Sequence, residues 1–176
     1  MIDELALSTI AFDTRIGWIV VAESPDGIAL LDFLGPDRPS DDAAASAVLK
    51  QYPNATLTPG HGSGLLEKTK DYILAYLTNR VPPPKIPLDL RKGTRFDRSV
   101  WSAIETIAFG ESRSYGQVAA EVHSPRASRA VGRACGRNPV PIFIPCHRVI
   151  ASAGKLGGYS GGLGIKRALL DLENSA

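Results

Sequence analysis

Cysteine is scarce in this sequence, and its scarcity excludes a disulfide-stapled fold. The 176 residues include only two cysteines, Cys135 and Cys146, whereas small disulfide-stabilised domains use several pairs. The three histidines are scattered, without the close Cys or His spacing of a structural zinc site. We therefore expect a reducing, cytoplasmic setting and no bound metal.

Long apolar runs are missing as well. No stretch of about 18 consecutive apolar residues occurs, which is the length that a membrane-spanning helix needs, so we expect no membrane contact. The first twelve residues, MIDELALSTIAF, include acids early and no basic segment before the apolar part, which is not typical of a signal peptide. With 44% hydrophobic and 22% charged residues, the composition instead indicates an ordinary globular chain.

Acidic residues are few in the second half of the chain only. Residues 1–90 contain 7 Lys and Arg against 12 Asp and Glu, whereas residues 91–176 contain 13 against 6. The net charge of +2 therefore conceals a first half at −5 and a second half at +7. A basic half favours a polyanionic partner, and a merely solvated basic face is the alternative that composition leaves open.

The first 90 residues are rich in strand formers. Three segments of β-forming residues, separated by the turn sequences DTR and SPDG, lie at Leu5–Phe12, Ile16–Glu23 and Gly27–Leu34. Short connections of this kind predict a small antiparallel sheet. Two helices are expected after it, one near Ala43–Gln51 capped by Ser40 or Asp41, and one over Ser63–Asn79.

Proline marks the end of this first part. Four prolines fall within the eleven residues RVPPPKIPLDL, Arg80–Leu90, which excludes a helix there. We interpret the segment as an extended linker and expect a domain boundary near residue 90, with domains at 1–90 and 91–176.

The second half is predicted to be mostly helical. A helix opens at Thr94, and its apolar face contains Phe96, Val100, Ile104, Ile107 and Ala108. Two short helices follow, over Tyr115–Val122 and Pro125–Cys135, the second with Ser124 as its N-cap, and a last helix covers Leu163–Glu173. The expected fold class is α/β (α+β), with a small N-terminal antiparallel sheet domain and a mostly helical C-terminal domain that contains a helix-turn-helix.

Four arginines recur at helical spacing along the second helix of this pair. Arg126, Arg129, Arg133 and Arg137 are separated by 3, 4 and 4 residues, which places them along one stripe of the helix. No acidic residue stands four positions away, and an arginine stripe without carboxylates suits phosphates. An ordinary solvated helix face is the alternative.

The candidate nucleophile is Cys146, in the sequence Pro-Cys-His-Arg. Buried cysteines are commonly small hydrophobic residues, as we expect of Cys135, but a base adjoins Cys146, and basic neighbours favour the reactive thiolate. Adjacent side chains of an extended segment point to opposite faces, so we expect a water between Cys146 and His147 and a carboxylate, Asp171 or Glu173, that orients the histidine. The glycine-rich segment that follows could form a pocket wall against a flat ligand.

Together these segments resemble the O6-alkylguanine-DNA alkyltransferases, which repair DNA by direct reversal. The resemblance rests on NPVPIFIPCHRVI, on GGYSGGL and, upstream, on SYGQVAAEV and SRAVGRACGRNP, in the same order and spacing. It covers residues 92–173 strongly, whereas the first 90 residues match in general layout only. The resemblance implies an RNase H-like α/β domain over 1–90 and a DNA-binding, catalytic domain over 91–176.

The resemblance also implies catalytic roles. Cys146 would attack the alkyl carbon on guanine O6, or less efficiently on thymine O4, and would keep the alkyl group, so that each molecule acts once. His147 would be the water-linked base, and Glu173 would orient it, with Asp171 as the fallback. Asn138 would fix the turn beside the active-site segment, and Tyr115 would rotate the phosphate of the nucleotide and help to protonate the departing guanine.

The substrate contacts that the resemblance implies surround an extruded base. Arg129 would enter the base stack in place of the flipped nucleotide, while Tyr159 and Ser160 would close the pocket. Pro141 and the carbonyls of Cys146 and Val149 would contact the ring and its exocyclic amine. Contacts to the DNA backbone would come from Ser124, Arg126, Arg133 and Arg137.

The partner implied by the resemblance is double-stranded DNA that contains O6-alkylguanine. No cofactor is expected, and the ligands of the zinc found in some family members are not available here. A monomer is expected, with cooperative assembly on DNA left open, in the cytoplasm at the nucleoid or, in a eukaryote, in the nucleus. Two alternatives are a DNA-binding sensor of alkylated guanine that transfers nothing, disfavoured by the intact Cys146 motif, and a Cys-His hydrolase with turnover, for which no oxyanion arrangement is visible.

Overall fold

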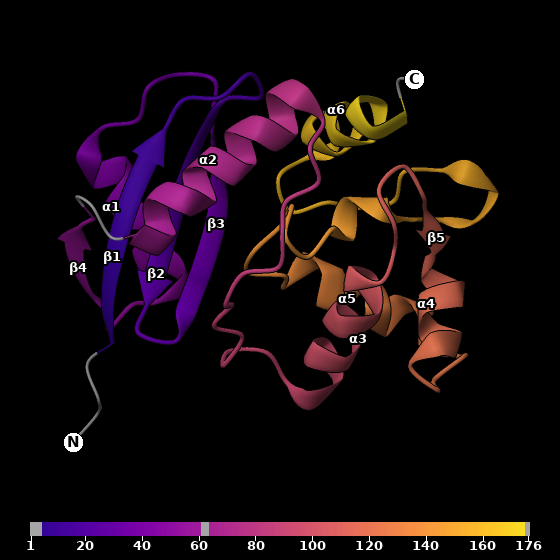
Figure 1. Cartoon of the computed structure of the whole chain (residues 1–176). Helices are drawn as coiled ribbons and strands as arrows, with labels where there is room; N and C mark the ends of the chain where they lie inside the picture. Colours follow the sequence, from indigo (N-terminus) through magenta and orange to yellow (C-terminus); the bar gives the residue numbers. More distant parts are fainter. Residues whose placement is uncertain (1–4, 61–63, 175–176) are drawn as a thin grey trace. The chain divides into compact units, whose positions relative to one another are not determined.

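The computed structural model describes residues 5–60 and 64–174, so Ser63, the expected start of the second helix, lies outside the described residues. The chain forms two compact units, Met1–Asp89 and Leu90–Ala176, and Figure 1 labels the helices and most of the strands. No helix in the described ranges is long and apolar enough to cross a membrane. The RNase H-like assignment of residues 1–90 stays a prediction.

The first unit is built on a four-stranded sheet. Its strands are β1 (Ala6–Phe12), β2 (Trp18–Ser24), β3 (Gly27–Gly35) and β4 (Thr56–Pro59), in the order β3-β2-β1-β4. The pairs β1–β2 and β2–β3 are antiparallel, as expected, whereas β4 runs parallel to β1. The sheet is thus antiparallel except at one edge, and the expected α/β (α+β) fold class is confirmed. Sequence analysis missed β4, because four residues with one proline give too short a pattern.

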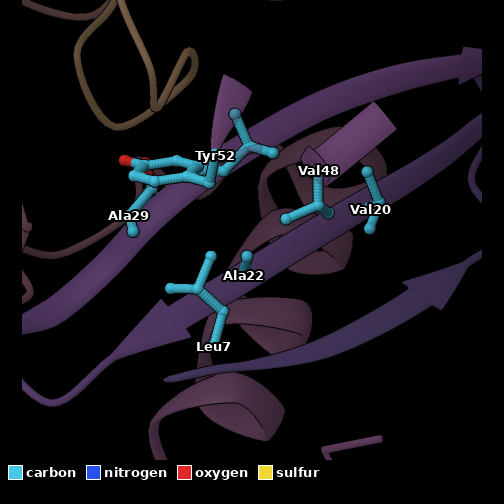
Figure 2. Packing of buried hydrophobic residues seen from close by; sticks show 7 residues of the cluster. Leu7, Val20, Ala22, Ala29, Val48 and Tyr52 are labelled. Atoms are coloured by element: carbon cyan, nitrogen blue, oxygen red, sulfur yellow. The ribbon is translucent and has the colours of Figure 1, made fainter. Parts of the chain in front are cut away.

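Two helices pack on this sheet. Helix α1 (Asp41–Gln51) begins after Ser40, whose side chain accepts a hydrogen bond from the Ala43 N–H, so the cap is Ser40 rather than Asp41. Helix α2 (Gly64–Asn79) buries the apolar positions of its repeat, Leu66, Thr69, Ile73, Tyr76 and Leu77. Figure 2 shows Val48 and Tyr52 at the end of α1 against the core side chains Leu7, Val20, Ala22 and Ala29.

The proline-rich segment forms no helix, as predicted, and its end is hydrogen-bonded to β3. The Ile28 N–H donates to the carbonyl of Pro87 at 3.0 Å, and the Asp89 N–H donates to the carbonyl of Ile28 at 2.9 Å. The carboxylate of Asp89 accepts a further bond from the Ser24 hydroxyl at 2.6 Å. These bonds hold the end of the segment along one edge of the first unit.

The second unit is mostly helical. Its helices are α3 (Arg95–Glu105), α4 (Tyr115–Glu121), α5 (Ser128–Gly136) and α6 (Leu163–Asn174), and the short strands β5 (Arg113–Ser114) and β6 (Val149–Ile150) form a parallel pair. Thr94 and Asp97 form a capping box at α3, and Ser114 and Gln117 form one at α4. Of the predicted apolar face of α3, Val100, Ile104 and Ile107 are buried, whereas Ala108 is exposed.

The predicted start of α5 is wrong. The helix begins at Ser128 after Ala127, which makes no side-chain capping bond, and Ser124 does not cap it. The reason is the end of α4, where His123 has a φ of 54° and the Ser124 N–H donates to the carbonyl of Ala119 at 2.8 Å. This left-handed helix ending is followed by a turn in which the Ala127 N–H donates to the Ser124 carbonyl, and Pro125 and Arg126 lie in that turn.

Candidate active site

Cys146 begins a 3₁₀ turn (Cys146–Arg148) at the end of a buried segment. Its side chain is 2% exposed, and Sγ lies 3.0 Å from Nδ2 of Asn138, which donates to it. The same amide donates to the carbonyl of Ile144 at 2.8 Å, and its oxygen accepts from the Val140 N–H at 3.0 Å. Asn138 therefore fixes the turn before the cysteine and supplies a hydrogen-bond donor to the sulfur.

The expectation of an extended backbone at Cys146 and His147 is wrong. The Arg148 N–H donates to the carbonyl of Pro145 at 2.9 Å, and the Val149 N–H donates to the carbonyl of Cys146, so the backbone turns at these residues. Side chains on such a turn are not directed to opposite faces as on a strand. The water between the cysteine and the histidine stays a prediction.

His147 is fully buried and is held by Glu173. Nε2 of the imidazole lies 2.8 Å from Oε1 of Glu173, and the carboxylate also accepts from the Gly110 N–H at 3.1 Å. Because a carboxylate with these donors around it is ionised and only accepts, we assign the imidazole proton to Nε2, which leaves Nδ1 as the basic nitrogen. Burial lowers the pKa of His147 although Glu173 opposes the shift, so the ring is neutral at pH 7 and able to take a proton.

The sequence left open whether Asp171 or Glu173 orients His147. In the structure, Glu173 is the carboxylate that is hydrogen-bonded to the imidazole. Glu173 is buried, whereas Asp171 on the same helix is exposed. The last turn of α6 therefore positions the group that orients His147.

Arg148, which the sequence suggested only as a cationic neighbour of the thiol, is a site residue bonded to Glu173. Its Nε donates to Oε2 of Glu173 at 2.9 Å and its Nη2 donates to Oε1 at 2.8 Å, a two-pronged ion pair. Nη1 donates to the carbonyl of Ile107 at 2.7 Å, and the guanidinium lies 5.8 Å from the centre of the Phe109 ring. The only sequence signal was the arginine that completes the Pro-Cys-His-Arg motif. Arg148 supplies the positive charge that keeps buried Glu173 ionised.

Lys166 is a site residue that sequence analysis missed. It is 0% exposed, and Nζ donates to the carbonyls of Val149, at 2.7 Å, and Gly158, at 3.3 Å. The available signal was its position on α6, seven residues before Glu173 and three before buried Leu169, which places all three on one helix face. Lys166 thus ties the segment after Cys146 to the glycine-rich segment.

The charge of Lys166 also acts on the thiol. Burial raises the pKa of Cys146 to about 11, and the hydrogen bond from Asn138 and the charge of Lys166 oppose that rise. Burial lowers the pKa of Lys166 itself. At neutral pH the sulfur is therefore a thiol that needs a base, and two neighbouring groups stabilise its anion.

Tyr115 and the glycine-rich segment lie together beside these residues. The Tyr115 hydroxyl donates to the carbonyl of Gly158 at 3.4 Å, and Lys166 Nζ lies 5.9 Å from the centre of its ring. Burial raises the pKa of Tyr115 to about 12, so its hydroxyl retains its proton and can donate. Tyr159 is half-buried, and Ser160 is exposed.

Position 157, which packs against the Tyr115 side chain, requires glycine. Its φ is 66°, and a Cβ built on it would lie 2.7 Å from the Tyr115 hydroxyl. For the O6-alkylguanine substrates that the sequence resemblance implies, we expect Gly157→Ala to displace the tyrosine and to slow reaction with O6-benzylguanine more than with O6-methylguanine, because a narrowed pocket penalises the larger group. The measurement is the pair of second-order rate constants. Gly158→Ala is the matched control, since a Cβ at Gly158 has nothing within 4 Å; equal losses in the two variants would contradict the prediction.

The arginines of the predicted stripe separate into two groups. Arg126, Arg129 and Arg133 are exposed, and no ion pair is recorded for them within the described ranges. Arg137 instead pairs with buried Asp97 at the start of α3, with Nη2–Oδ1 and Nε–Oδ2 distances of 2.5 and 3.2 Å. The sequence has no acidic residue four positions from these arginines, but the packing of α3 brings a distant carboxylate to Arg137.

This pairing ties α5 to α3. The indole Nε1 of Trp101 on α3 also donates to the carbonyl of Ala134 on α5, at 2.9 Å. The inner face of α5 is buried at Val131, Ala134 and Cys135, which leaves Arg129 and Arg133 on its outer face. Within residues 5–60 and 64–174 no cluster of residues suited to a metal is found.

Two features indicate the class. Exposed arginines on the helix pair have no neutralising carboxylate among the described residues, and a cysteine thiol accepts a hydrogen bond from Asn138 beside the charge of Lys166; both are typical of a nucleic-acid-binding protein with a reactive cysteine. Comparison with known proteins agrees. Residues 95–175 match the family model described as "6-O-methylguanine DNA methyltransferase, DNA binding domain".

Relatives extend the match over nearly the whole chain. The methylated-DNA–protein-cysteine methyltransferase of Mycobacterium tuberculosis is 49% identical over 120 residues, which are 68% of this chain and 70% of the relative. The constitutive methylated-DNA–protein-cysteine methyltransferase of Bacillus subtilis is 39% identical over 164 residues, 92% of each chain. The crystal structure of Mycobacterium tuberculosis OGT in complex with DNA has a TM-score of 0.76 at 39% identity and covers 97% of this chain and 93% of that one. The chain belongs to the methylated-DNA–protein-cysteine methyltransferase family, and the family prediction is confirmed.

Proposed function

We propose that this protein repairs O6-alkylguanine in double-stranded DNA by moving the alkyl group onto Cys146. The observation on which this rests most directly is the set of contacts around the sulfur. Asn138 donates to Sγ, Lys166 favours its anion, and His147 held by Glu173 is the nearby base. Its relatives are named for the same transfer to cysteine.

The reaction balances with these groups and solvent water. Nδ1 of His147 takes the thiol proton through a water, and the thiolate attacks the alkyl carbon, so that a C–S bond forms as the C–O6 bond breaks. The bonding pair leaves with guanine, which takes a proton from the Tyr115 hydroxyl. The tyrosine recovers a proton from solvent and His147 releases the one that it accepted, so no net charge remains on the protein. No group in this set can cleave the thioether, so each molecule acts once.

Access to the alkyl group requires that the base leave the stack. An O6-alkyl group is not reachable within the duplex, and a weakened base pair lowers the cost of extrusion. We propose that α5 enters the minor groove, where its small residues allow close approach and Arg129 fills the gap left by the base. Arg126, Arg133 and Ser124 would contact phosphates, whereas Arg137 is engaged with Asp97.

The extruded base would lie against the segments that Lys166 joins. Buried Pro141 and the carbonyls of Cys146 and Val149 would contact the ring and its amine, while Tyr159 and Ser160 close the pocket. The Val149 carbonyl already accepts from Lys166, so a base amine would use its second lone pair. We propose that one chain acts on one lesion as a monomer.

The test is the intact mass of the protein after incubation with a duplex that contains O6-methylguanine. The proposal predicts a gain of one methyl group per chain, absent in Cys146→Ala. An unchanged mass with tight binding to the lesion would identify a sensor instead, and repeated turnover would identify a hydrolase.

The role of Arg129 gives a separate prediction. Because extrusion of a base costs a few kcal/mol, we expect Arg129→Ala to slow methyl transfer from duplex DNA by about tenfold or more, while the reaction with free O6-benzylguanine keeps its rate. Single-turnover rates on the two substrates measure this. Arg167→Ala, which removes an exposed arginine of α6, is the control. Equal losses on both substrates would count against a role in extrusion.

A further inference from the structure

A shallow groove lies on the second unit, away from the cysteine. It has a volume of about 620 Å³, and its lining includes Arg95, Arg98, Ser102, Thr106, Glu121 and His123. Arg95, Arg98 and Ser102 lie on α3 and Thr106 is its C-cap; these residues recur every three or four positions, so they form one exposed face at that helix. The opposite wall is the end of α4 and the residues that follow it. We name this feature the α3 groove.

The charges in the α3 groove are predominantly positive. Its one acidic residue, Glu121, is neutralised by Arg113, whose Nη1 lies 2.6 Å from Oε2, and its other oxygen accepts from the Thr106 hydroxyl at 3.3 Å. Within the described ranges, by contrast, no ion pair is recorded for Arg95 or Arg98. Arg98 donates to the backbone carbonyl of Gly93, which holds its position without removing its charge. Two guanidinium groups therefore face solvent without a neutralising partner.

The positive charge continues toward α5. His123 lines the groove, and Arg126 follows three residues later in the exposed turn before α5. Arg129, on the first turn of α5, extends this positive surface, although its proposed contact is with the base stack rather than with a phosphate. Arginines in such a row, with serine hydroxyls among them, match a chain of phosphates, because guanidinium groups bind phosphate oxygens in pairs. An acidic peptide would also satisfy the charge. Continuity with the arginines of α5 favours a nucleic acid.

We propose that the α3 groove binds the sugar–phosphate backbone of the DNA that flanks the lesion, as a second phosphate track beside α5. This inference rests on the proposed function, since it assumes that α5 is bound to a duplex. Contacts of this kind position the protein and carry no sequence information. The groove would therefore strengthen binding to damaged and undamaged DNA alike.

The experiment compares Arg95→Gln/Arg98→Gln with the parent protein. Glutamine removes the charge and keeps a polar side chain at two exposed positions. Binding to an undamaged duplex and to one with O6-methylguanine is titrated over a range of salt concentrations. Because each phosphate contact adds about 0.9 to the slope of log K against log salt, we expect the slope to fall by about 2 on both duplexes. Lys85→Gln/Arg167→Gln, which removes the same charge from two other exposed positions, should leave the slope unchanged.

Two checks separate the possible failures. If the parent protein gains no methyl group from the lesion duplex, the proposed function itself fails. If the parent gains it and the groove variant shows the same salt slope as the control variant, only the groove inference is overturned. A variant that binds single sites normally but loses cooperative binding would also overturn it, since that result assigns the groove to a protein partner. The reaction with free O6-benzylguanine confirms that both variants are folded.

Discussion

Glu173→Gln is expected to reduce methyl transfer by about 100-fold or more, because His147 loses the carboxylate that holds its tautomer and orientation. The same change leaves the buried guanidinium of Arg148 without its counter-charge, since both Nε and Nη2 donate to Glu173. Breaking a buried ion pair by removing one partner costs about 3 to 5 kcal/mol. The variant should therefore lose both rate and stability.

The measurements are the single-turnover rate at a temperature where the variant is folded and the free energy of unfolding in urea. Asp171→Asn is the matched control for the rate, because it removes an exposed carboxylate from the same helix and should leave the single-turnover rate unchanged. A stable Glu173→Gln protein with the rate of the parent would contradict the role of the His147–Glu173 pair.

Lys166→Met should shift the pH dependence of alkyl transfer to higher pH. The charge of Lys166 lowers the pKa of Cys146, so its removal raises that pKa, and less thiolate is available at any given pH. A shift of one pH unit reduces the rate at neutral pH about tenfold. Because burial lowers the pKa of Lys166, its charge is lost at a lower pH than that of an exposed lysine, and the two profiles should converge on the alkaline side.

The pH profile distinguishes this electrostatic role from a structural one. Lys166 also bonds the carbonyls of Val149 and Gly158, and a lost partner of a buried group costs about 1 to 3 kcal/mol, so some loss of rate is expected on structural grounds. The rate of the parent and of Lys166→Met is measured with free O6-benzylguanine from pH 6 upward. A uniform loss at every pH, with no displacement of the profile, would contradict the electrostatic role.

The sequence pattern predicted those helices and strands that depend on residues close together in the chain. The three strands of the first sheet, the Ser40 cap and the helix that follows Thr94 each depend on neighbouring residues, and the structure confirms them. Strand β4 was not predicted, because it is short and contains a proline and because its partner β1 lies about 50 residues earlier in the sequence. The start of α5 was misplaced because the left-handed ending at His123 precedes Ser124-Pro125 and uses the residues that would otherwise cap the helix.

Site residues that lie within one short sequence motif were predicted. Site residues that depend on contacts between distant segments were not. Cys146, His147 and Asn138 lie within nine residues of one another. The choice of Glu173 over Asp171, the pairing of Arg137 with Asp97 and the burial of Lys166 instead depend on how α3, α5 and α6 pack. Sequence spacing indicates which residues share a helix face, but not which partner from another helix meets that face.

The central claim is that Cys146 accepts the alkyl group, and the most direct test is the site of methylation. After one equivalent of a duplex with O6-methylguanine, the protein is digested and its peptides are analysed by mass spectrometry. We predict S-methylcysteine at Cys146 and an unmodified thiol at Cys135, which is also buried, on α5. Cys135→Ser should still take up one methyl group, and Cys146→Ser should take up none. Methyl on Cys135, or loss of methyl from the DNA while both cysteines stay unmodified, would contradict the account.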